Sequence, residues 1–261
     1  MLKNREAINT FLLALFYAVG FYVLNFLLHQ RDMVANIPDN EKLLFWDAGY
    51  YHEIAEKGYL FIEGRSNNTA FYMLFPIIWK LLGLSPMGIA FVNVLFFAAG
   101  FSIFTSIYKL NNAQKFMWLT IPSLYFCFIP YTEALFMLLM SVAFLGMYRN
   151  NRYLIWTGLF LLSLTRPVTM VLAPAFLITE LITNDRRNWL RSIGSFFVNY
   201  GVPLIAGQFF FIWYQYYQTG VWFAFFKVEK YWGHEFSIPT LPFNSMNGPK
   251  LLWLNALAIF L

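Results

Sequence analysis

Thr10-Phe-Leu-Leu-Ala-Leu-Phe-Tyr-Ala-Val-Gly-Phe-Tyr-Val-Leu-Asn-Phe-Leu-Leu28 contains no charged residue. A helix needs about 20 mostly apolar residues to cross the hydrocarbon core of a membrane, so this run predicts a membrane-spanning helix. Lys3 and Arg5 precede it, as they would in a signal peptide, but His29-Gln30-Arg31 offers no small-residue cleavage site. We therefore expect a retained helix whose N-terminus is cytoplasmic.

The composition of the whole chain agrees with a membrane protein. Its 261 residues are 59% hydrophobic and 12% charged, whereas soluble domains are about 45–50% apolar and about 25% charged. This excludes a soluble enzyme, and the single cysteine, Cys127, excludes a disulfide scaffold. The net charge of +5 is explained by cytoplasmic loops and does not indicate a nucleic-acid partner. We expect an all-α polytopic membrane protein.

Further apolar segments follow the first one. They cover about residues 85–108, 116–129, 131–148, 153–165, 168–182 and 192–215, and several are short and separated by Pro130, Pro167 or Pro174. Ala70–Leu84 is also apolar, but it is broken by Pro76 and predicts a half-helix or re-entrant piece that does not span. Broken helices are tolerated at membrane depth only where protein or a wet cavity covers the freed backbone groups, so we expect a bundle that contains a cavity.

The basic residues of the connections predict the topology. They fall in alternate connections, at Lys3/Arg5, Lys109/Lys115, Arg149/Arg152 and Arg186/Arg187/Arg191. The positive-inside rule places these groups in the cytoplasm. The long acidic loop at about residues 30–69, the Pro130 corner, the 165–167 corner and residues 216–250 then share the opposite face.

The acidic loop contains an unusual cluster at residues 45–59. Asp47 can cap a short helix, Ala48–Lys57, that Gly58 terminates. The apolar stripe of this helix comprises Tyr50, Tyr51, Ile54 and Ala55, which predicts that the helix lies along the membrane surface. The spacing alone leaves Asp47 with two interpretations, a simple helix cap or a carboxylate of a functional site.

Three other polar features map to the same face. Glu133 opens an apolar helix, where it either complements the helix dipole or serves a site. Arg166 lies between apolar runs and can snorkel, pair with Glu133 or hold the phosphate of a lipid-linked substrate. Residues 226–235, with Lys230, resemble an interfacial anchor of Lys, Tyr and Trp. Asn67-Asn68-Thr69 is a glycosylation sequon.

These pieces resemble the second GPI mannosyltransferase (PIG-V) family. Residues 45–59 followed by Ala70-Phe-Tyr-Met-Leu-Phe-Pro76 are similar to its first outer loop, where a Trp-Asp and an Ile-Ala-x-x-Gly-Tyr precede an Ala-Phe-aromatic-Pro stretch. Tyr131-Thr-Glu-Ala-Leu-Phe136 resembles its Tyr-(Ser/Thr)-Glu-x-Leu-Phe. Thr165-Arg-Pro-Val168 resembles its Thr-Arg-(Ser/Pro)-x-Gly, although Thr169 stands where the family often has glycine. Residues 220–232 are more loosely similar to a late outer loop.

The resemblance implies a GT-C-type helical bundle in which residues 1–261 form one transmembrane glycosyltransferase domain. It also implies a polyprenyl-phosphate sugar donor, with mannose as the expected hexose, a lipid-linked or glycan acceptor, and a periplasmic, extracellular or luminal site. In that superfamily an aspartate of the first outer loop is essential, and Asp47 occupies the matching place. Neither a cofactor nor an essential metal is expected.

The residue types suit an inverting transfer. Asp47 is the expected base for the acceptor hydroxyl, and Arg166, with Lys230 second, is expected to stabilise the leaving phosphate. Trp46 and Tyr50 are expected to contact sugar, and Glu133 completes the substrate-binding set.

Two other functions stay open at this point: a transporter of lipid-linked substrates, and a non-catalytic accessory membrane subunit. The chain ends inside an apolar run, residues 251–261, from which we expect a C-terminally truncated fragment.

Overall fold

The computed structural model describes residues 2–34, 37–167, 169–183 and 189–232 of the chain, and this part contains eleven α-helices and no strand. Three helical stretches are long and apolar enough to cross a membrane. They lie in α1 (Leu2–Gln30), in α4 (Pro86–Tyr108), and in a continuous stretch formed by α9 (Trp189–Phe196), a π-helical turn (Phe197–Gly201) and α10 (Val202–Thr219). The chain therefore has the helices of an integral membrane protein.

The other helices are shorter. They are α2 (Asp47–Lys57), α3 (Leu74–Leu82), α5 (Asn112–Leu119), α6 (Glu133–Tyr148), α7 (Arg152–Ser163), α8 (Thr169–Thr183) and α11 (Ala224–Glu229). Short 3-10 turns occupy Lys42–Leu44, Asn68–Ala70, Pro122–Cys127 and Lys230–Trp232.

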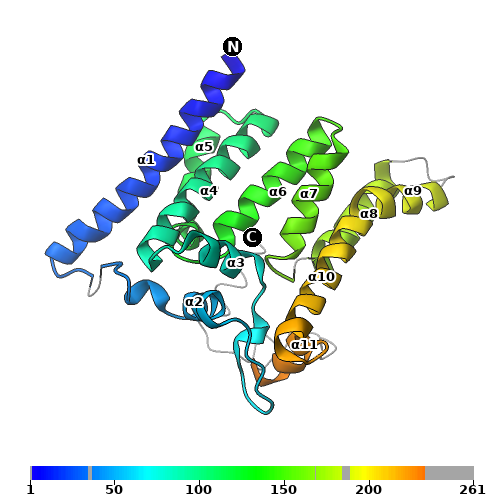
Figure 1. Ribbon diagram of the computed structural model, residues 1–261. Helices are drawn as coiled ribbons and strands as arrows, with labels where there is room; N and C mark the ends of the chain where they lie inside the picture. Colours follow the sequence, from blue (N-terminus) through cyan, green and yellow to red (C-terminus); the bar gives the residue numbers. More distant parts are fainter. Residues whose placement is uncertain (1, 35–36, 168, 184–188, 233–261) are drawn as a thin grey trace, which may run out of the picture.

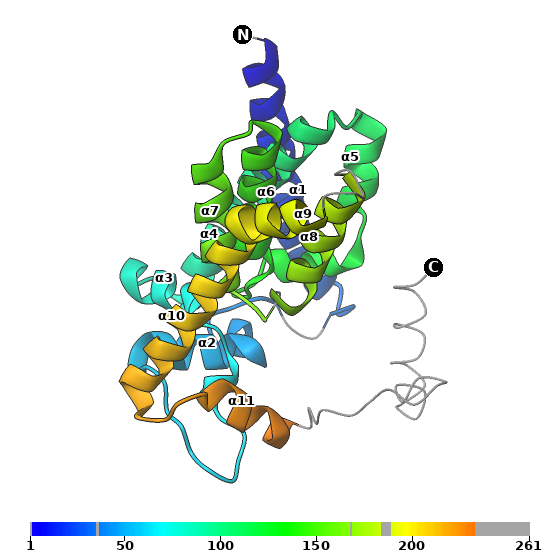
Figure 2. The same cartoon turned by 90° about the vertical axis from the view of Figure 1, so that its right-hand side faces the viewer.

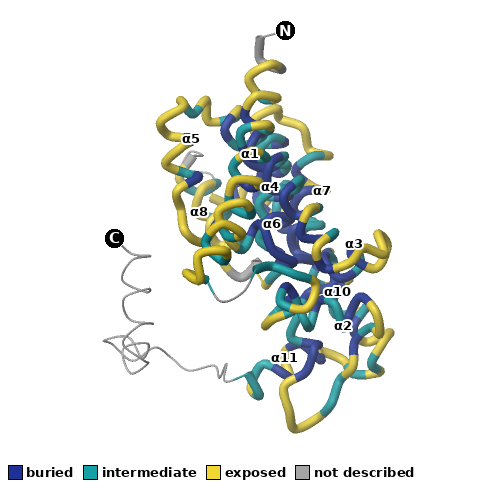
Figure 3. The backbone as a smooth tube through the Cα atoms, turned by 90° about the vertical axis from the view of Figure 1, so that its left-hand side faces the viewer, coloured by how far each residue is buried: buried dark blue, intermediate teal, exposed yellow. Residues whose placement is uncertain are grey.

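The core of the bundle is a row of helices in which α4 packs between α1 and α6, and α7 packs between α6 and α10 (Figure 1). Buried positions concentrate along α4 and α6 (Figure 3). Small residues let these helices approach closely: a Cβ on Gly100 would lie 2.9 Å from the backbone of Leu138, and one on Gly158 would lie 2.9 Å from the backbone of Ala143. Small residues at such interfaces are typical of helix packing in membranes.

The two ends of the bundle carry different residues. At one end α5 approaches the start of α1, where Lys115 pairs with Glu6 at 3.1 Å, and α6 joins α7 through Arg149 (Figures 1 and 2). At the other end lie α2 and α11 (Figure 2). The described basic connections therefore lie opposite α2, while the assignment of this end to the cytoplasm stays a prediction.

The structure confirms the prediction for Ala70–Leu84. Its helix, α3, has 9 residues, which is about half of what a membrane span needs. The predicted start of α4 is confirmed too, because Pro86 occupies its first turn and the Ser85 side chain accepts a hydrogen bond from the backbone N–H of Gly88.

Two helix boundaries were predicted wrongly. Residues 116–129 do not form one apolar helix, because α5 ends at Leu119 and Ile121 adopts an extended conformation (φ −67°, ψ 118°) before Pro122. The ring of a proline disfavours helical geometry in the residue before it. Pro174, by contrast, lies inside α8 and does not separate two segments. The predictions for Arg186, Arg187 and residues 233–261 lie outside the described residues.

Candidate active site

A pocket of about 430 Å³ opens beside the start of α2. It brings together three segments that are far apart in the sequence: the start of α2, the stretch before α3, and the connection from α7 to α8. Its lining residues are Asp47, Tyr51, Ala70, Phe71, Tyr72, Thr165, Arg166, Pro167 and Val171.

The cation of the pocket is held by the corner that opens α6. Arg166 donates a hydrogen bond from Nη2 to Oε1 of Glu133. It donates a second from Nε to the hydroxyl oxygen of Thr132, at 2.9 Å. The sequence allowed Arg166 to snorkel, to pair with Glu133 or to hold a phosphate, and the structure contains the pair with Glu133. The side chain of Arg166 is still 36% exposed, so the guanidinium is accessible from the pocket.

Asp47 faces the same pocket in an environment that favours its neutral form. Partial burial raises the pKa of Asp47 above its usual value, and the nearby Arg166 guanidinium opposes this rise. The interpretation of Asp47 as the helix cap is wrong, because α2 begins at Asp47 itself and Trp46 occupies the cap position without a side-chain hydrogen bond. The Asp47 carboxylate therefore does not cap α2, the role that the spacing first suggested.

The chain makes a strained turn to bring Asp47 to this position. Trp46 has φ 53° and ψ −127°, a region that side chains with a Cβ rarely adopt, and its carbonyl accepts the N–H of Gly49 at 3.2 Å. A Cβ on Gly49 would lie 2.8 Å from the carbonyl oxygen of Leu44, so only glycine fits there. Strain of this kind persists where the surrounding structure enforces it, and it concentrates at functional sites.

Helix α2 is fixed by packing on its inner face. Tyr51 is buried edge-on against Phe71 and Phe75, with ring centroids 5.3 and 5.5 Å apart. Most of the predicted apolar stripe, Tyr51, Ile54 and Ala55, is thereby buried against the protein. Helix α3 and the loop before it cover most of this stripe, so the stripe packs against protein, while the position of α2 along a membrane surface stays a prediction.

The Pro130 corner is held by a polar residue inside the bundle. Asn93 of α4 is fully buried, and its Nδ2 donates to the carbonyl oxygens of Ile129 at 2.5 Å and Tyr131 at 2.8 Å. Ala90, one turn earlier, packs in the same cluster as Ala48 of α2. Helix α4 therefore sets the position of both the Glu133 corner and the start of α2.

The loop between α2 and α3 is ordered by buried amides. Gln215 of α10 donates to the carbonyl of Thr69 at 2.7 Å and accepts the N–H of Phe225 at 3.1 Å, so it joins α10 and α11 to the loop. Asn67 is 7% exposed, and its Nδ2 donates to two backbone carbonyls within the loop. The acceptor nitrogen of the sequon is thus engaged inside the fold, which argues against a glycan on Asn67.

The remaining predicted residues do not line this pocket. Tyr50 stacks on Phe71 with centroids 4.8 Å apart and meets Trp232 edge-on at 5.2 Å. Trp46 lines a separate pocket on the other side of the turn. Lys230 is exposed, with its Nζ 4.6 Å from the Tyr231 ring centroid.

Several residues that shape the site were missed from the sequence. Asn93 is the one amide side chain of α4, and Gln215 is one of three in α10; a polar side chain in an apolar helix is a signal that sequence reasoning can use. Thr132 stands at the Ser/Thr position of the Tyr-(Ser/Thr)-Glu pattern, but its contact with Arg166 is seen only in the structure.

Within the described residues, no three His, Cys, Asp or Glu side chains lie close enough together to hold a metal ion. No family model, curated protein or solved structure matches the chain.

Proposed function

We propose that this protein transfers a hexose, with mannose as the first candidate, from a polyprenyl-phosphate donor to an acceptor on the non-cytoplasmic side of the membrane. The observation that carries the proposal is the shared pocket of Asp47 and Arg166, which combines a half-buried carboxylate with an accessible guanidinium. The pocket lies at the end of the bundle opposite the described basic connections, which agrees with an outer or luminal site.

Asp47 supplies the base of the proposed reaction. An acceptor hydroxyl loses its proton to the Asp47 carboxylate while its oxygen bonds to the anomeric carbon of the sugar, and the bond from that carbon to the phosphate oxygen breaks. The sugar is transferred with inversion, and polyprenyl phosphate leaves with the bonding electrons. Partial burial raises the pKa of Asp47, which makes the carboxylate a better proton acceptor than an ordinary exposed aspartate.

Arg166 stabilises the leaving phosphate in this proposal. A guanidinium has five N–H donors, and the contacts with Thr132 and Glu133 use two of them. Arg166 can therefore keep both contacts, which fix its orientation, and still donate to a phosphate in the pocket. Because the leaving group is already ionised, it needs such donors more than it needs a proton.

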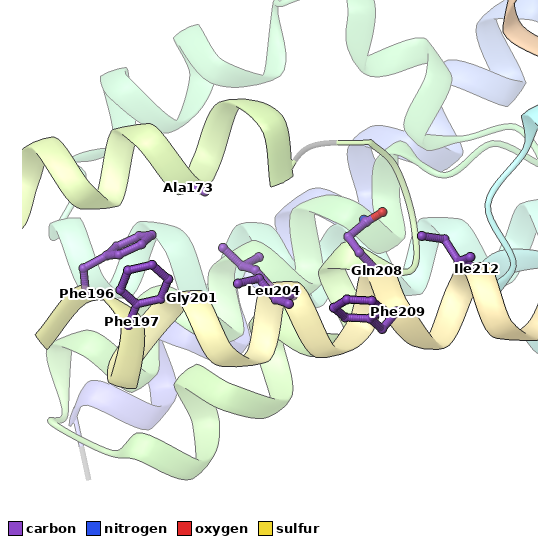
Figure 4. Close-up of a pocket in the computed structure, with 9 residues that line it drawn as sticks. Ala173, Phe196, Phe197, Gly201, Leu204, Gln208, Phe209 and Ile212 are labelled. Carbon is purple, nitrogen blue, oxygen red and sulfur yellow. The ribbon is translucent and has the colours of Figure 1, made fainter. Parts of the chain in front are cut away.

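An apolar groove beside the pocket suits the isoprenoid chain of the donor. Its volume is about 420 Å³, and side chains of α9, the π-helical turn and α10 line it together with Ala173 of α8 (Figure 4). Gln208 lines this groove, and Tyr72 lines the pocket of Asp47 and Arg166. The Tyr72 hydroxyl donates a hydrogen bond to Oε1 of Gln208 at 3.1 Å, so the two spaces are linked by one contact. A lipid tail in the groove would thus have its phosphate end directed toward Arg166.

Reconstitution with labelled donors tests the proposal. The purified protein in liposomes is given polyprenyl-phosphate [³H]mannose or, as the matched control, GDP-[³H]mannose, together with a membrane lipid and glycan extract. We expect label to move into an acceptor from the first donor alone. Movement of the intact donor across the bilayer without a product would favour a transporter, absence of both would favour an accessory subunit, and either result would contradict the proposal.

A further inference from the structure

The hydroxyl of Tyr51 belongs to the pocket but has no part in the reaction as described so far. Tyr51 lies four residues after Asp47 in α2, so the two side chains project from the same face of the helix, and both line the pocket. The charges of Asp47, Arg166 and Glu133 all affect the pKa of this hydroxyl. The hydroxyl therefore lies near both the carboxylate and the cation of the pocket.

The ring of Tyr51 is fixed by packing. Its edge-on contacts with Phe71 and Phe75 bury the side chain, and Tyr51 is only 5% exposed. Burial strongly raises the pKa of Tyr51, so the phenol stays neutral at physiological pH. Tyr51 thus supplies a rigid O–H group to the pocket without adding a charge.

Thr132 connects this hydroxyl to Arg166. It is fully buried, and its hydroxyl oxygen accepts a hydrogen bond from Nε of Arg166 at 2.9 Å. Its own hydrogen stays available for a second contact. A hydrogen bond with the Thr132 side chain lowers the pKa of Tyr51, which is the effect of Thr132 donating to the phenolic oxygen. The hydrogen bonds therefore run from Arg166 through Thr132 to Tyr51.

This order leaves the phenolic hydrogen of Tyr51 for a ligand. Among the described residues, the Tyr51 hydroxyl has no other hydrogen bond, and the Asp47 carboxylate does not accept one from it. Thr132 contacts both Tyr51 and Arg166, so a group that binds the remaining N–H donors of Arg166 lies within reach of the Tyr51 hydrogen as well. An anionic oxygen has the lone pairs to accept from both donors.

We propose that Tyr51 and Arg166 together bind the phosphate of the polyprenyl donor, and that Thr132 is the positioning residue that aligns these two donors. The assignment rests on the proposed function and deepens it, because it gives roles to Tyr51 and Thr132. Negative charge grows on the phosphate oxygen as its bond to the anomeric carbon breaks, and a fixed O–H donor stabilises that charge. The proton stays on Tyr51 throughout.

Binding of farnesyl phosphate tests the assignment without requiring transfer. This probe carries the phosphate and an isoprenoid chain, as the leaving group does, and farnesol is the matched control that lacks the phosphate. The dissociation constants of both are measured with the purified protein in nanodiscs, against empty nanodiscs. We expect the wild-type protein to prefer farnesyl phosphate, and Tyr51→Phe to lower that preference by about ten- to hundredfold, the range for a hydrogen bond to a charged group.

Matched variants separate the hydrogen bonds from the fold. Tyr51→Phe keeps the ring and its packing, and an unchanged affinity for farnesol reports that the pocket is intact. Thr132→Val removes the hydroxyl at nearly constant volume and should lower the phosphate preference, whereas Thr132→Ser keeps the hydroxyl and should retain it. Tyr217→Phe, the same change at an exposed tyrosine of α10, should have no effect.

A phosphate preference that survives Tyr51→Phe, or that is absent from the wild-type protein, would overturn the assignment. A Thr132→Ser variant that binds as weakly as Thr132→Val would overturn the positioning role of Thr132. With transfer intact, each of these results would leave the proposed function in place. Failure of transfer from every donor, with a phosphate preference that depends on Tyr51, would instead overturn the proposed function and leave the phosphate site in place.

Discussion

Opposing electrostatic effects act on Asp47. Its partial burial favours the protonated carboxylic acid, and the Arg166 guanidinium favours the carboxylate. Glu133 shares that guanidinium, so the site contains two carboxylates and one cation. Such an arrangement suits a group that must gain and lose a proton during each turnover, because burial and Arg166 act on the pKa of Asp47 in opposite directions.

The pH dependence of transfer should report the influence of Arg166. Only the ionised form of Asp47 can accept a proton, so activity should fall on the acid side as pH drops through its pKa. Arg166 lowers that pKa, and removal of its charge in Arg166→Gln should therefore raise the pKa and move the acidic limb of the rate profile to higher pH. The measurement is the initial rate of hexose transfer from about pH 4 to pH 8.

Two further variants control this experiment. Arg166→Lys keeps the charge and should shift the limb less than Arg166→Gln does. Arg65→Gln removes an exposed charge of the loop between α2 and α3 and should not shift the limb. An acidic limb that stays in place in Arg166→Gln, or moves to lower pH, would contradict the assigned roles.

Glycine residues in the bundle differ in how closely a neighbouring helix approaches them. Gly100 of α4 lies against the backbone of Leu138 in α6, whereas Gly20 of α1 has no neighbouring heavy atom within 4 Å of the position that a Cβ would take. Both glycines lie inside helices of spanning length. The same substitution should therefore have opposite consequences at the two positions.

Gly100→Ala should destabilise the bundle, since the added methyl group would force α4 and α6 apart at a cost of about 1–3 kcal/mol. Gly20→Ala should be neutral or slightly stabilising, because alanine favours a helix more than glycine does. Thermal unfolding of the two purified variants in the same detergent measures the difference. Equal stability of the two variants would contradict the close approach of α4 and α6.

The elements show what the sequence can and cannot predict. Residues 10–28 and 85–108 were recognised as spans because their apolar runs are long and uninterrupted. Residues 116–129 were misjudged, since composition does not record the extended backbone at Ile121. The site residues Asp47, Glu133 and Arg166 were placed on one face by the alternation of basic connections. The sequence offered the Arg166–Glu133 pair as one of three interpretations but could not select it, because the contact depends on how α4 holds two distant segments through Ala90 and Asn93.

The whole molecule has two chemically distinct ends. Four basic residues of the connections, Lys109, Lys115, Arg149 and Arg152, lie at the end where α6 meets α7, and the start of α2, which carries Asp47, lies at the other (Figures 1 and 2). The positive-inside rule predicts that the first end is cytoplasmic. Donor and acceptor would then both meet Asp47 at the outer surface.

Cysteine labelling tests this orientation. In a Cys127→Ser background, Ser66→Cys places a thiol between α2 and α3 and Asn150→Cys places one between α6 and α7, and both positions are exposed. A membrane-impermeant maleimide should label Ser66→Cys in intact cells and Asn150→Cys only after the membrane is permeabilised. The reverse pattern would place the Asp47 pocket in the cytoplasm.

The most direct test compares Asp47→Asn with Glu56→Gln, an isosteric change at an exposed carboxylate of the same helix. The measured quantity is the transfer of [³H]mannose from polyprenyl phosphate by equal amounts of folded protein. We predict that Asp47→Asn lowers the rate by about a hundred- to ten-thousand-fold, the range lost with a general base, while Glu56→Gln keeps the wild-type rate. Full activity of Asp47→Asn would contradict the catalytic role of Asp47 and with it the proposed reaction.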